Sequence, residues 1–151
     1  MVKQTDEWFK IHNPSIYTHG CLFLSLVATR EDFANLSHAA INAMYKGCVE
    51  LGHITENKQL KAFVNSYDGI LEAVQSKYRW RSRIEIKYDN IQQLLDMAGY
   101  DTAIIRYATN FASHFTLLNN GKEYNPYQKP ASYNLELLGI NRIDLLRKII
   151  N

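Results

Sequence analysis

The chain has 151 residues, of which 46% are hydrophobic, and its formal net charge at pH 7 is +2. A chain of this length and composition can bury a core without disulfides or metals, so we expect a single domain over residues 1–151. The charge is too small for a module that binds nucleic acid electrostatically, and a nucleic-acid partner is therefore not expected.

The first half of the sequence is predicted to be mainly helical. After an irregular entry that ends at Asn13-Pro14, a run that is apolar on nearly all sides indicates a short buried helix, with Cys21 at its start. Later segments have amphipathic helical spacing of their apolar residues. The predicted helices cover residues 20–28, about 35–51, 57–64 and 70–74.

The second half changes to the period of a strand at Tyr78, where aromatic and apolar residues alternate with basic ones. The basic face can bind an anionic polymer, but a polar face on a solvated strand is the simpler interpretation. An Asn-Gly step predicts a hairpin between the last two strands, and a helix is expected to follow the sheet. The predicted strands cover residues 78–88, 102–107, 113–118 and 122–124, and the predicted helices cover about 90–98 and 141–150.

The sequence gives no sign of a membrane segment, a metal or a cofactor. No apolar run reaches the roughly 18 to 20 residues that cross a bilayer, and the polar first residues lack the layout of a secretion signal, which predicts a cytoplasmic protein unless another route releases it. The two cysteines are not at the close spacings of zinc or disulfide frameworks, and the histidines have no partners at metal-ligand spacing. The residues considered were Cys21, Cys48, His12, His38 and His53.

Cys21 is the candidate nucleophile. A thiol reacts as the thiolate, and the positive end of a helix dipole together with a nearby imidazolium lowers its pKa. We expect Gly20 to leave room for a substrate carbonyl beside the backbone amide of Cys21, which would be one oxyanion donor. The alternative is that Cys21 is one more small apolar residue of a buried helix.

His114 and Asn125 are the candidate partners of this thiol. His114 begins a predicted strand beside a hairpin, a position from which an imidazole can be directed into a cleft. Asn125 follows the next strand and can hold the far ring nitrogen of His114 if the two strands pair. Considered singly, each is more simply a strand-end histidine or a turn residue before Pro126, and only the ordered combination favours a catalytic site.

The segments around these residues resemble a known group of enzymes. They are similar to the bacteriocin-processing and related cysteine peptidase-like families of the papain-like superfamily, over about residues 13–127. The resemblance implies an α+β papain-like fold in which N-terminal helices, the nucleophile helix first, pack on a small antiparallel β-sheet that a C-terminal helix follows. The matching segments are THGCLFLSL at 18–26, YDGI at 67–70, HFTLL at 114–118 and GKEYNP at 121–126.

The resemblance also implies the roles of individual residues. Those families have a Gly-Cys step at the start of the first helix, a histidine before an aromatic residue on a strand, and an Asp-Pro step after the next strand. Asn replaces that Asp here, which the wider papain-like group accepts. The oxyanion glutamine expected shortly before the cysteine is absent, and its possible substitutes are Asn13, Ser15 and the more distant Gln4. The roles of nucleophile, base and orienting residue pass to Cys21, His114 and Asn125.

The activity that the resemblance implies is hydrolysis of an amide bond through an acyl-enzyme, without a cofactor. The substrate would be a peptide or the peptide portion of bacterial cell wall, and a phage-type lysis enzyme released by another factor would suit the chain's size. The alternative is a catalytically inactive papain-like protein with a binding or structural role. In its Lys-, Asn-, Ile- and Tyr-rich composition the chain is also similar to an uncharacterised family of small spirochaete proteins, some of them plasmid- or prophage-borne.

Overall fold

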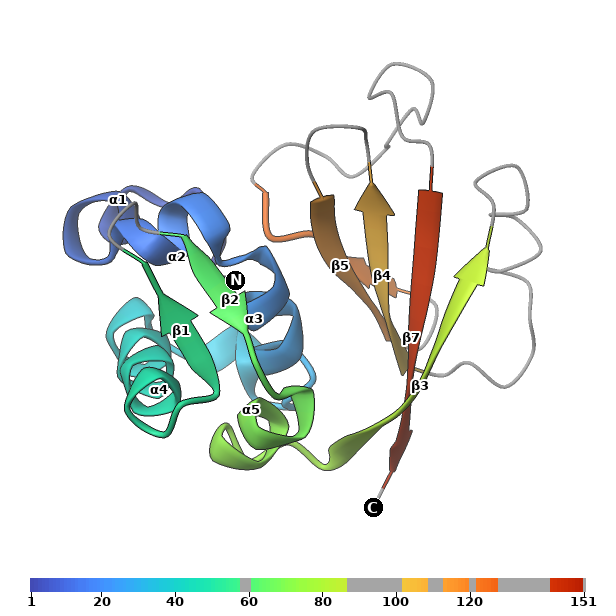
Figure 1. The fold of residues 1–151 in the computed structure, drawn as a ribbon. Coiled ribbons are helices and arrows are strands. Elements are labelled where there is room, and N and C mark those ends of the chain that lie inside the picture. The colour runs from blue at the N-terminus through green and yellow to red at the C-terminus, as the bar shows by residue number, and fades with distance from the viewer. Residues whose placement is uncertain (58–60, 87–101, 109–112, 120–121, 128–141, 151) are drawn as a thin grey trace.

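The protein is α+β, as predicted. A group of helices and a two-stranded hairpin lie beside a five-stranded antiparallel sheet (Figure 1). The computed structural model describes residues 1–57, 61–86, 102–108, 113–119, 122–127 and 142–150. Within this part of the chain, the helices are α1 (Glu7–His12), α2 (Pro14–His19), α3 (Cys21–Val27), the 3-10 helix η1 (Phe33–Asn35), α4 (His38–Glu50) and α5 (Tyr67–Ala73).

The N-terminal entry is helical, and the prediction of an irregular segment was wrong. Pro14 is the first residue of α2, where its fixed φ suits a helix and its missing N–H costs no hydrogen bond. The side chain of Asn13 accepts a hydrogen bond from the N–H of Ile16 at 3.4 Å and so caps the helix. The Asn-Pro step therefore marks the start of a helix.

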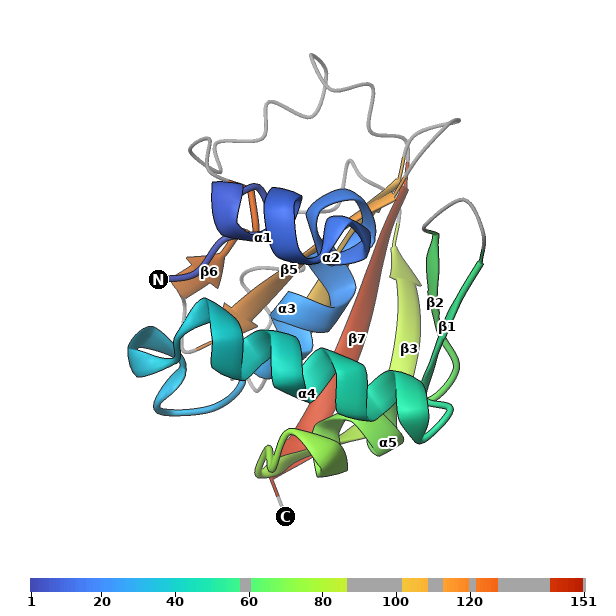
Figure 2. The same cartoon turned by 90° about the vertical axis from the view of Figure 1, so that its left-hand side faces the viewer.

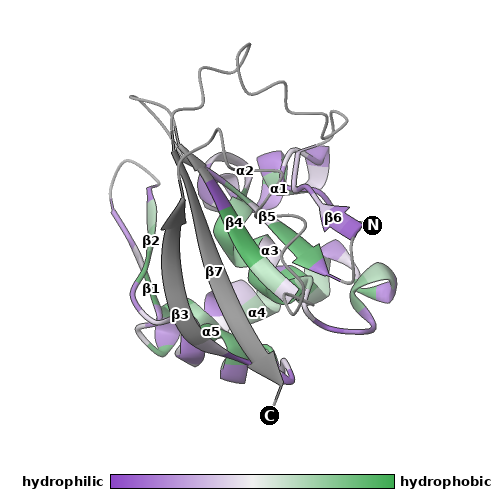
Figure 3. Cartoon of the chain, turned by 90° about the vertical axis from the view of Figure 1, so that its right-hand side faces the viewer, coloured by the Kyte–Doolittle hydropathy of each residue, from purple (hydrophilic) through white to green (hydrophobic). Residues whose placement is uncertain are grey.

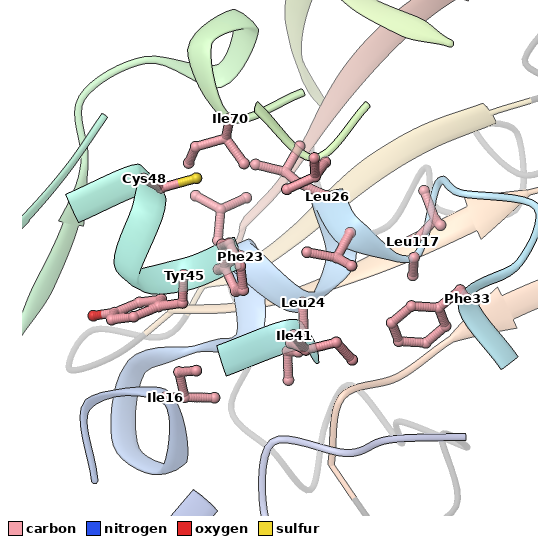
Figure 4. Close-up of a cluster of buried hydrophobic side chains, with 14 of the residues drawn as sticks. Ile16, Phe23, Leu24, Leu26, Phe33, Ile41, Tyr45, Cys48, Ile70 and Leu117 are labelled. Carbon is pink, nitrogen blue, oxygen red and sulfur yellow. The ribbon is translucent and has the colours of Figure 1, made fainter. Parts of the chain in front are cut away.

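Helix α3 runs through the hydrophobic core. All seven of its residues are buried, which confirms the prediction of a helix that is apolar on nearly all sides. Phe23 meets Tyr45 of α4 edge to face, with ring centroids 5.2 Å apart. Figure 4 shows Leu24 and Leu26 among side chains from neighbouring elements. Since each large apolar side chain that is buried contributes about 1.5–3 kcal/mol, this packing fixes α3 and its first residue in place.

Helix α4 covers the same core and is shorter than predicted. It begins after Ser37, whose Oγ accepts a hydrogen bond from the N–H of Ala40 at 3.1 Å. It ends before Gly52, whose φ of 79° is the left-handed conformation expected of a C-cap glycine. The residues that α4 buries, one or two turns apart on one stripe, are Ile41, Tyr45 and Cys48.

The last three residues of the helix predicted over residues 57–64 form a strand of a hairpin, so the prediction was wrong there. Strands β1 (Ile54–Glu56) and β2 (Ala62–Val64) pair antiparallel, with Ile54 opposite Val64. The apolar spacing of so short a segment does not separate helix from strand, and its β-branched and aromatic residues favour the strand. Residues 58–60 lie outside the described residues. The helix predicted next is present as α5.

The larger sheet has the strand order β3-β7-β4-β5-β6, and every described neighbour pair is antiparallel. The helices lie on one side of this sheet, as Figures 2 and 3 show from opposite directions. Figure 3 also shows that β4 is mainly apolar. The four predicted strands are confirmed, and Asn119 lies opposite Lys122 as a two-residue hairpin loop requires. The strands are β3 (Tyr78–Ile86), β4 (Thr102–Ala108), β5 (Ser113–Asn119), β6 (Lys122–Tyr124) and β7 (Arg142–Ile150).

The helix predicted over residues 141–150 was wrong, because this segment forms β7. The spacing of its apolar residues fits a helical face, but the segment is paired on both sides, by β3 and by β4. Pairing of this kind satisfies the backbone groups of a strand and outweighs a weak local preference for helix. The helix predicted at about 90–98 lies outside the described residues.

Candidate functional site

His114 and Asn125 are joined by a buried hydrogen bond. Nε2 of His114 lies 2.8 Å from Oδ1 of Asn125. The backbone N–H of Tyr127 donates to the same Oδ1 at 3.1 Å, and since an N–H only donates, the shared atom is the amide oxygen. Nε2 of His114 therefore carries a proton, and Nδ1 has the basic lone pair.

Tyr127 lies against the histidine and extends this arrangement. Its ring stacks on that of His114 with centroids 3.9 Å apart and an angle of 9° between the planes. Burial raises the pKa of Tyr127, and the nearby Cys21 adds to that rise. Tyr127 is thus beside both the histidine and the thiol, and the sequence analysis did not identify it. The signal that was available is an aromatic residue two positions after the candidate asparagine.

Cys21 is the first residue of α3 and lies where this helix meets β5. The backbone of Phe115, the residue after His114, hydrogen-bonds the thiol, as do the backbone groups of Leu22 and Cys21 itself. Ser25, one turn further along α3, donates from Oγ to the C=O of Cys21 at 2.7 Å and to that of Phe115 at 3.4 Å. The start of α3 is therefore attached to β5 at Phe115, the residue that follows His114, and the structure joins His114 to Asn125 directly.

Both members of the Cys21–His114 pair are neutral at pH 7. Burial raises the pKa of the Cys21 thiol above its ordinary value, and the backbone hydrogen bond from Phe115 opposes this rise only in part. Burial also lowers the pKa of His114 to about 4, against the hydrogen bond to Asn125, which raises it. Burial thus opposes the activation of the thiol that was expected from the helix dipole and an imidazolium.

Gly20 has a different role from the one predicted. A Cβ at this position would lie 2.5 Å from the backbone oxygen of Ile16 and 2.8 Å from its Cγ2. The space beside Gly20 is thus filled by the preceding helix α2 and is not kept for a substrate carbonyl. The glycine allows α3 to begin directly after α2, which places Cys21 at the turn between the two helices.

The three candidate oxyanion side chains lie in different surroundings. Asn13 donates from Nδ2 to Oδ1 of Asn42 at 2.7 Å, and Ser15 donates from Oγ to Oε2 of Glu56 at 2.8 Å, so the donors of both are engaged elsewhere. Gln4 is buried and lies next to the site, because its backbone N–H donates to the C=O of Pro126 at 2.7 Å.

Gln4 also reaches the last turn of α2. Its Nε2 donates to the C=O of Tyr17 at 3.1 Å. Its Oε1 is buried without a hydrogen-bond partner among the described residues. Gln4 therefore connects the end of α2 with the segment that follows Asn125, and both of these flank Cys21.

The thiol opens onto a cleft of 630 Å³ between the helical group and the five-stranded sheet. One wall comes from β2 and its preceding residue Lys61, and the opposite wall includes Arg106 of β4 and Tyr127. His19, which is exposed, lies in the lining. A cleft with a thiol in its lining beside a hydrogen-bonded His-Asn pair has the elements of an acyl-transfer site.

The other chemistry-bearing groups form local structural contacts. Just before β3, Lys77 pairs with Glu31 at 2.7 Å, and within the strand Arg79 donates to the C=O of Ser76 at 2.9 Å. β3 is also an edge strand of the sheet, where charge prevents edge-to-edge association. In the residues that the structure describes, no group of three His, Cys, Asp or Glu side chains is arranged to hold a metal ion.

Two further findings bear on the class of protein. No helix in the described part of the chain has the length and apolarity needed to cross a bilayer. Comparisons of the sequence and the fold with protein-family models, curated proteins and solved structures gave no match. The function of this protein therefore has to be inferred from the site itself.

Proposed function

We propose that this protein is a cysteine hydrolase of papain-like type that cleaves an amide bond in a peptide or a cell-wall peptide. The observation that carries the proposal is the buried hydrogen bond of 2.8 Å between Asn125 and His114, the residue directly before Phe115, whose backbone contacts the thiol of Cys21. It fixes the tautomer in which Nδ1 is the base, the arrangement that a thiol nucleophile needs. The phage-type setting suggested by the resemblance belongs to the same proposal.

Because Cys21 and His114 are both neutral before the reaction, the proton moves as the sulfur attacks. His114 Nδ1 takes the proton of Cys21 as the sulfur attacks the substrate carbonyl, and the imidazolium that forms is stabilised by Asn125. The same proton then passes to the leaving amine, which departs and leaves a thioester on Cys21. Water, deprotonated by His114, hydrolyses the thioester and restores the thiol.

The oxyanion of the tetrahedral intermediate needs hydrogen-bond donors. The backbone N–H groups of Cys21 and Leu22 adjoin the sulfur and are the first donors. The carboxamide of Gln4 is the best placed side chain for a second donor, because the backbone of Gln4 bonds Pro126 beside the site and only one of its two Nε2 hydrogens is used, in the bond to Tyr17. Loss of one oxyanion donor costs about 10²–10³ in kcat, so Gln4→Ala measures this role.

The test is covalent capture with peptidyl chloromethyl ketones, mapped by mass spectrometry. We expect modification at Cys21 and none at Cys48, with release of amine from the cognate peptide amide. His114→Ala should remove both reactions, and Asn125→Ala should slow them by about 10²- to 10⁴-fold, because the wrong tautomer is then populated. Cys48→Ala is the matched control. Modification of Cys21 that ignores His114 would contradict the proposal.

One observation favours a second candidate, a catalytically inactive papain-like binding protein. The pKa of the thiol is raised and that of the histidine lowered, so no thiolate is ready in the free protein. An inactive protein would bind peptides in the cleft without forming any adduct at Cys21. Peptide binding is therefore measured in parallel with the capture experiment. A protein that binds the peptide but forms no adduct at Cys21 is the inactive binding protein.

A further inference from the structure

Strand β6 ends at Tyr124, and the residues that follow it leave the sheet. The pair of Tyr124 and Leu117 is the last one described in the ladder of β5 and β6. Pro126 has no N–H to donate to a further pair. The backbone of Asn125, whose side chain reaches His114, is therefore held in place by contacts outside the sheet.

These contacts come from three consecutive residues near the start of the chain. Residues 2–4, which we call the clasp, lie beside residues 124–126 and bond them in the same order. The bonds run from Oη of Tyr124 to the C=O of Val2 at 2.8 Å, from Nζ of Lys3 to the C=O of Asn125 at 2.6 Å, and from the N–H of Gln4 to the C=O of Pro126 at 2.7 Å.

Lys3 is the member of the clasp that contacts Asn125 itself. Its Nζ also lies over the ring of Tyr124, 4.6 Å from the centroid. Burial lowers the pKa of Lys3, and the nearby Asp6 opposes that change. The C=O of Asn125 and the ring of Tyr124 thus replace part of the water around the ammonium group. A hydrogen bond from a charged donor is stronger than one between neutral groups.

The clasp is itself held by the helical group. The N–H of Lys3 donates to Oδ2 of Asp6 at 2.8 Å, and Nε2 of His38 in α4 lies 2.8 Å from the same oxygen. Val2 is buried in the hydrophobic core. The clasp therefore connects the segment that carries Asn125 to the helices, by a route that does not pass through the sheet.

We propose that Lys3 is a positioning residue of the site. Its ammonium group holds the backbone of Asn125 where the side-chain amide oxygen meets Nε2 of His114, and so selects the tautomer with a basic Nδ1. The inference rests on the proposed function for the reaction that uses this tautomer, but the effect on His114 is present in the free protein.

The first test is ¹⁵N NMR of the ring nitrogens of His114 at pH 7, on the full chain. Lys3→Met keeps the length of the side chain and removes the donor and its charge. We expect the wild-type protein to carry its proton on Nε2, and Lys3→Met to mix the two tautomers, so that the shifts of the two nitrogens approach each other. Lys3→Arg retains a charged donor and should restore the wild-type spectrum.

A lysine that only stabilises the fold would lower the unfolding midpoint and leave the tautomer unchanged in the folded protein. Lys46→Met, at an exposed lysine of α4, is the matched control and should change neither. If Lys3→Met fails to fold, Lys3→Gln replaces it, because this side chain is polar but too short to form the same bond.

The rate of covalent capture at Cys21 tests the consequence for the proposed reaction. Lys3→Met should slow it about tenfold, the lower end of what a charge-assisted hydrogen bond is worth, because Lys3 is only half-buried. In protein that already carries Asn125→Ala, Lys3→Met should slow capture no further, because Lys3 acts through the side chain of Asn125.

The outcomes separate the two proposals. An unchanged tautomer in folded Lys3→Met protein, or the same slowing with and without the side chain of Asn125, would overturn the role of Lys3 and leave the hydrolase in place. A changed tautomer together with no adduct at Cys21 in the wild-type protein would remove the hydrolase and leave Lys3 as the residue that positions Asn125.

Discussion

Two Gly-Cys steps in this chain, Gly20-Cys21 and Gly47-Cys48, have opposite surroundings. Gly47 lies inside α4 with open space where a Cβ would be, and the thiol of Cys48 points into the apolar core (Figure 4). Gly20 lies against the backbone of Ile16 between two helices, and the thiol of Cys21 lines a cleft beside a histidine. A Gly-Cys dipeptide thus does not determine the chemistry of its thiol, which depends on the elements packed around it.

Alkylation should show the largest difference from an ordinary thiol at Cys48. Burial raises the pKa of Cys48 from 9.0 to about 11, so the thiolate fraction at pH 7 falls about 100-fold and iodoacetamide should react about 100-fold more slowly than in the urea-unfolded chain. Cys21 should also be slowed, because burial raises its pKa, but less so because it lines a cleft. Mass spectrometry over time measures both rates in one sample.

A fast reaction at Cys21 would contradict the raised pKa of this thiol. If Cys21 reacts at pH 7 faster than an unfolded thiol, a thiolate is present and the pair with His114 is ionised. The His114→Ala variant then separates two causes. A thiolate stabilised by the imidazolium is lost in this variant, whereas one stabilised by the backbone at Phe115 remains.

Acid should destabilise the Cys21 side of the molecule through His114. Its folded-state pKa of about 4 lies below the ordinary value of 6.5, so the unfolded chain takes up the proton first as the pH falls. The free energy of unfolding is unaffected by this group above about pH 7, and falls by roughly 2 to 3 kcal/mol as the pH drops from 6.5 to 4. Urea unfolding at pH 7 and 4.5 measures this loss, and His114→Gln should show less of it. An equal loss in both proteins would assign it to other groups.

The two glycines give a matched pair of substitutions. Gly20→Ala should lower the free energy of unfolding by about 1–3 kcal/mol, because the new Cβ would collide with the backbone of Ile16. Gly47→Ala should raise it by about 0.5–1 kcal/mol, because the site is open and alanine favours a helix. The thermal unfolding midpoints of the two variants should thus shift in opposite directions. Shifts of the same sign would show that the two glycines do not differ in this way.

Removal of each thiol should have a modest effect on stability. Cys48→Ala leaves a small cavity in the core and should cost about 1–2 kcal/mol, while Cys21→Ala faces the cleft and should cost less than about 1 kcal/mol. Chemical denaturation measures both. A larger cost at Cys21 would favour a structural thiol over a nucleophile.

The contact between His114 and Asn125 could be anticipated from sequence because the hairpin signal fixes how β5 and β6 pair. The protonation of the site could not be anticipated. Helix position alone suggested an activated thiol, whereas the pKa values depend on burial by segments far apart in the chain. Tyr127 was missed for a related reason, since only the folded structure shows its ring lying on His114.

The fold was predictable where periodicity and turn signals agreed, as in α3 and in the hairpin of β5 and β6. The prediction failed where the apolar spacing of a short segment fits both a helix and a strand. Residues 62–64 and 142–150 have apolar spacings that a helix would also accept, and their partners β1, β3 and β4 decide for the strand. At Pro14 the error was different, because a proline that opens a helix was interpreted as part of a loop.

The position of β7 has a consequence for how the molecule folds. This strand follows all the other described elements in the sequence, yet it lies between β3 and β4, which have no other connection within the sheet. Until residues 142–150 have been synthesised, both of those strands have an unpaired edge open to other chains. Pairs so distant in sequence form slowly, so the sheet that supports His114 should be completed late, in the interval when the nascent protein is most prone to aggregate.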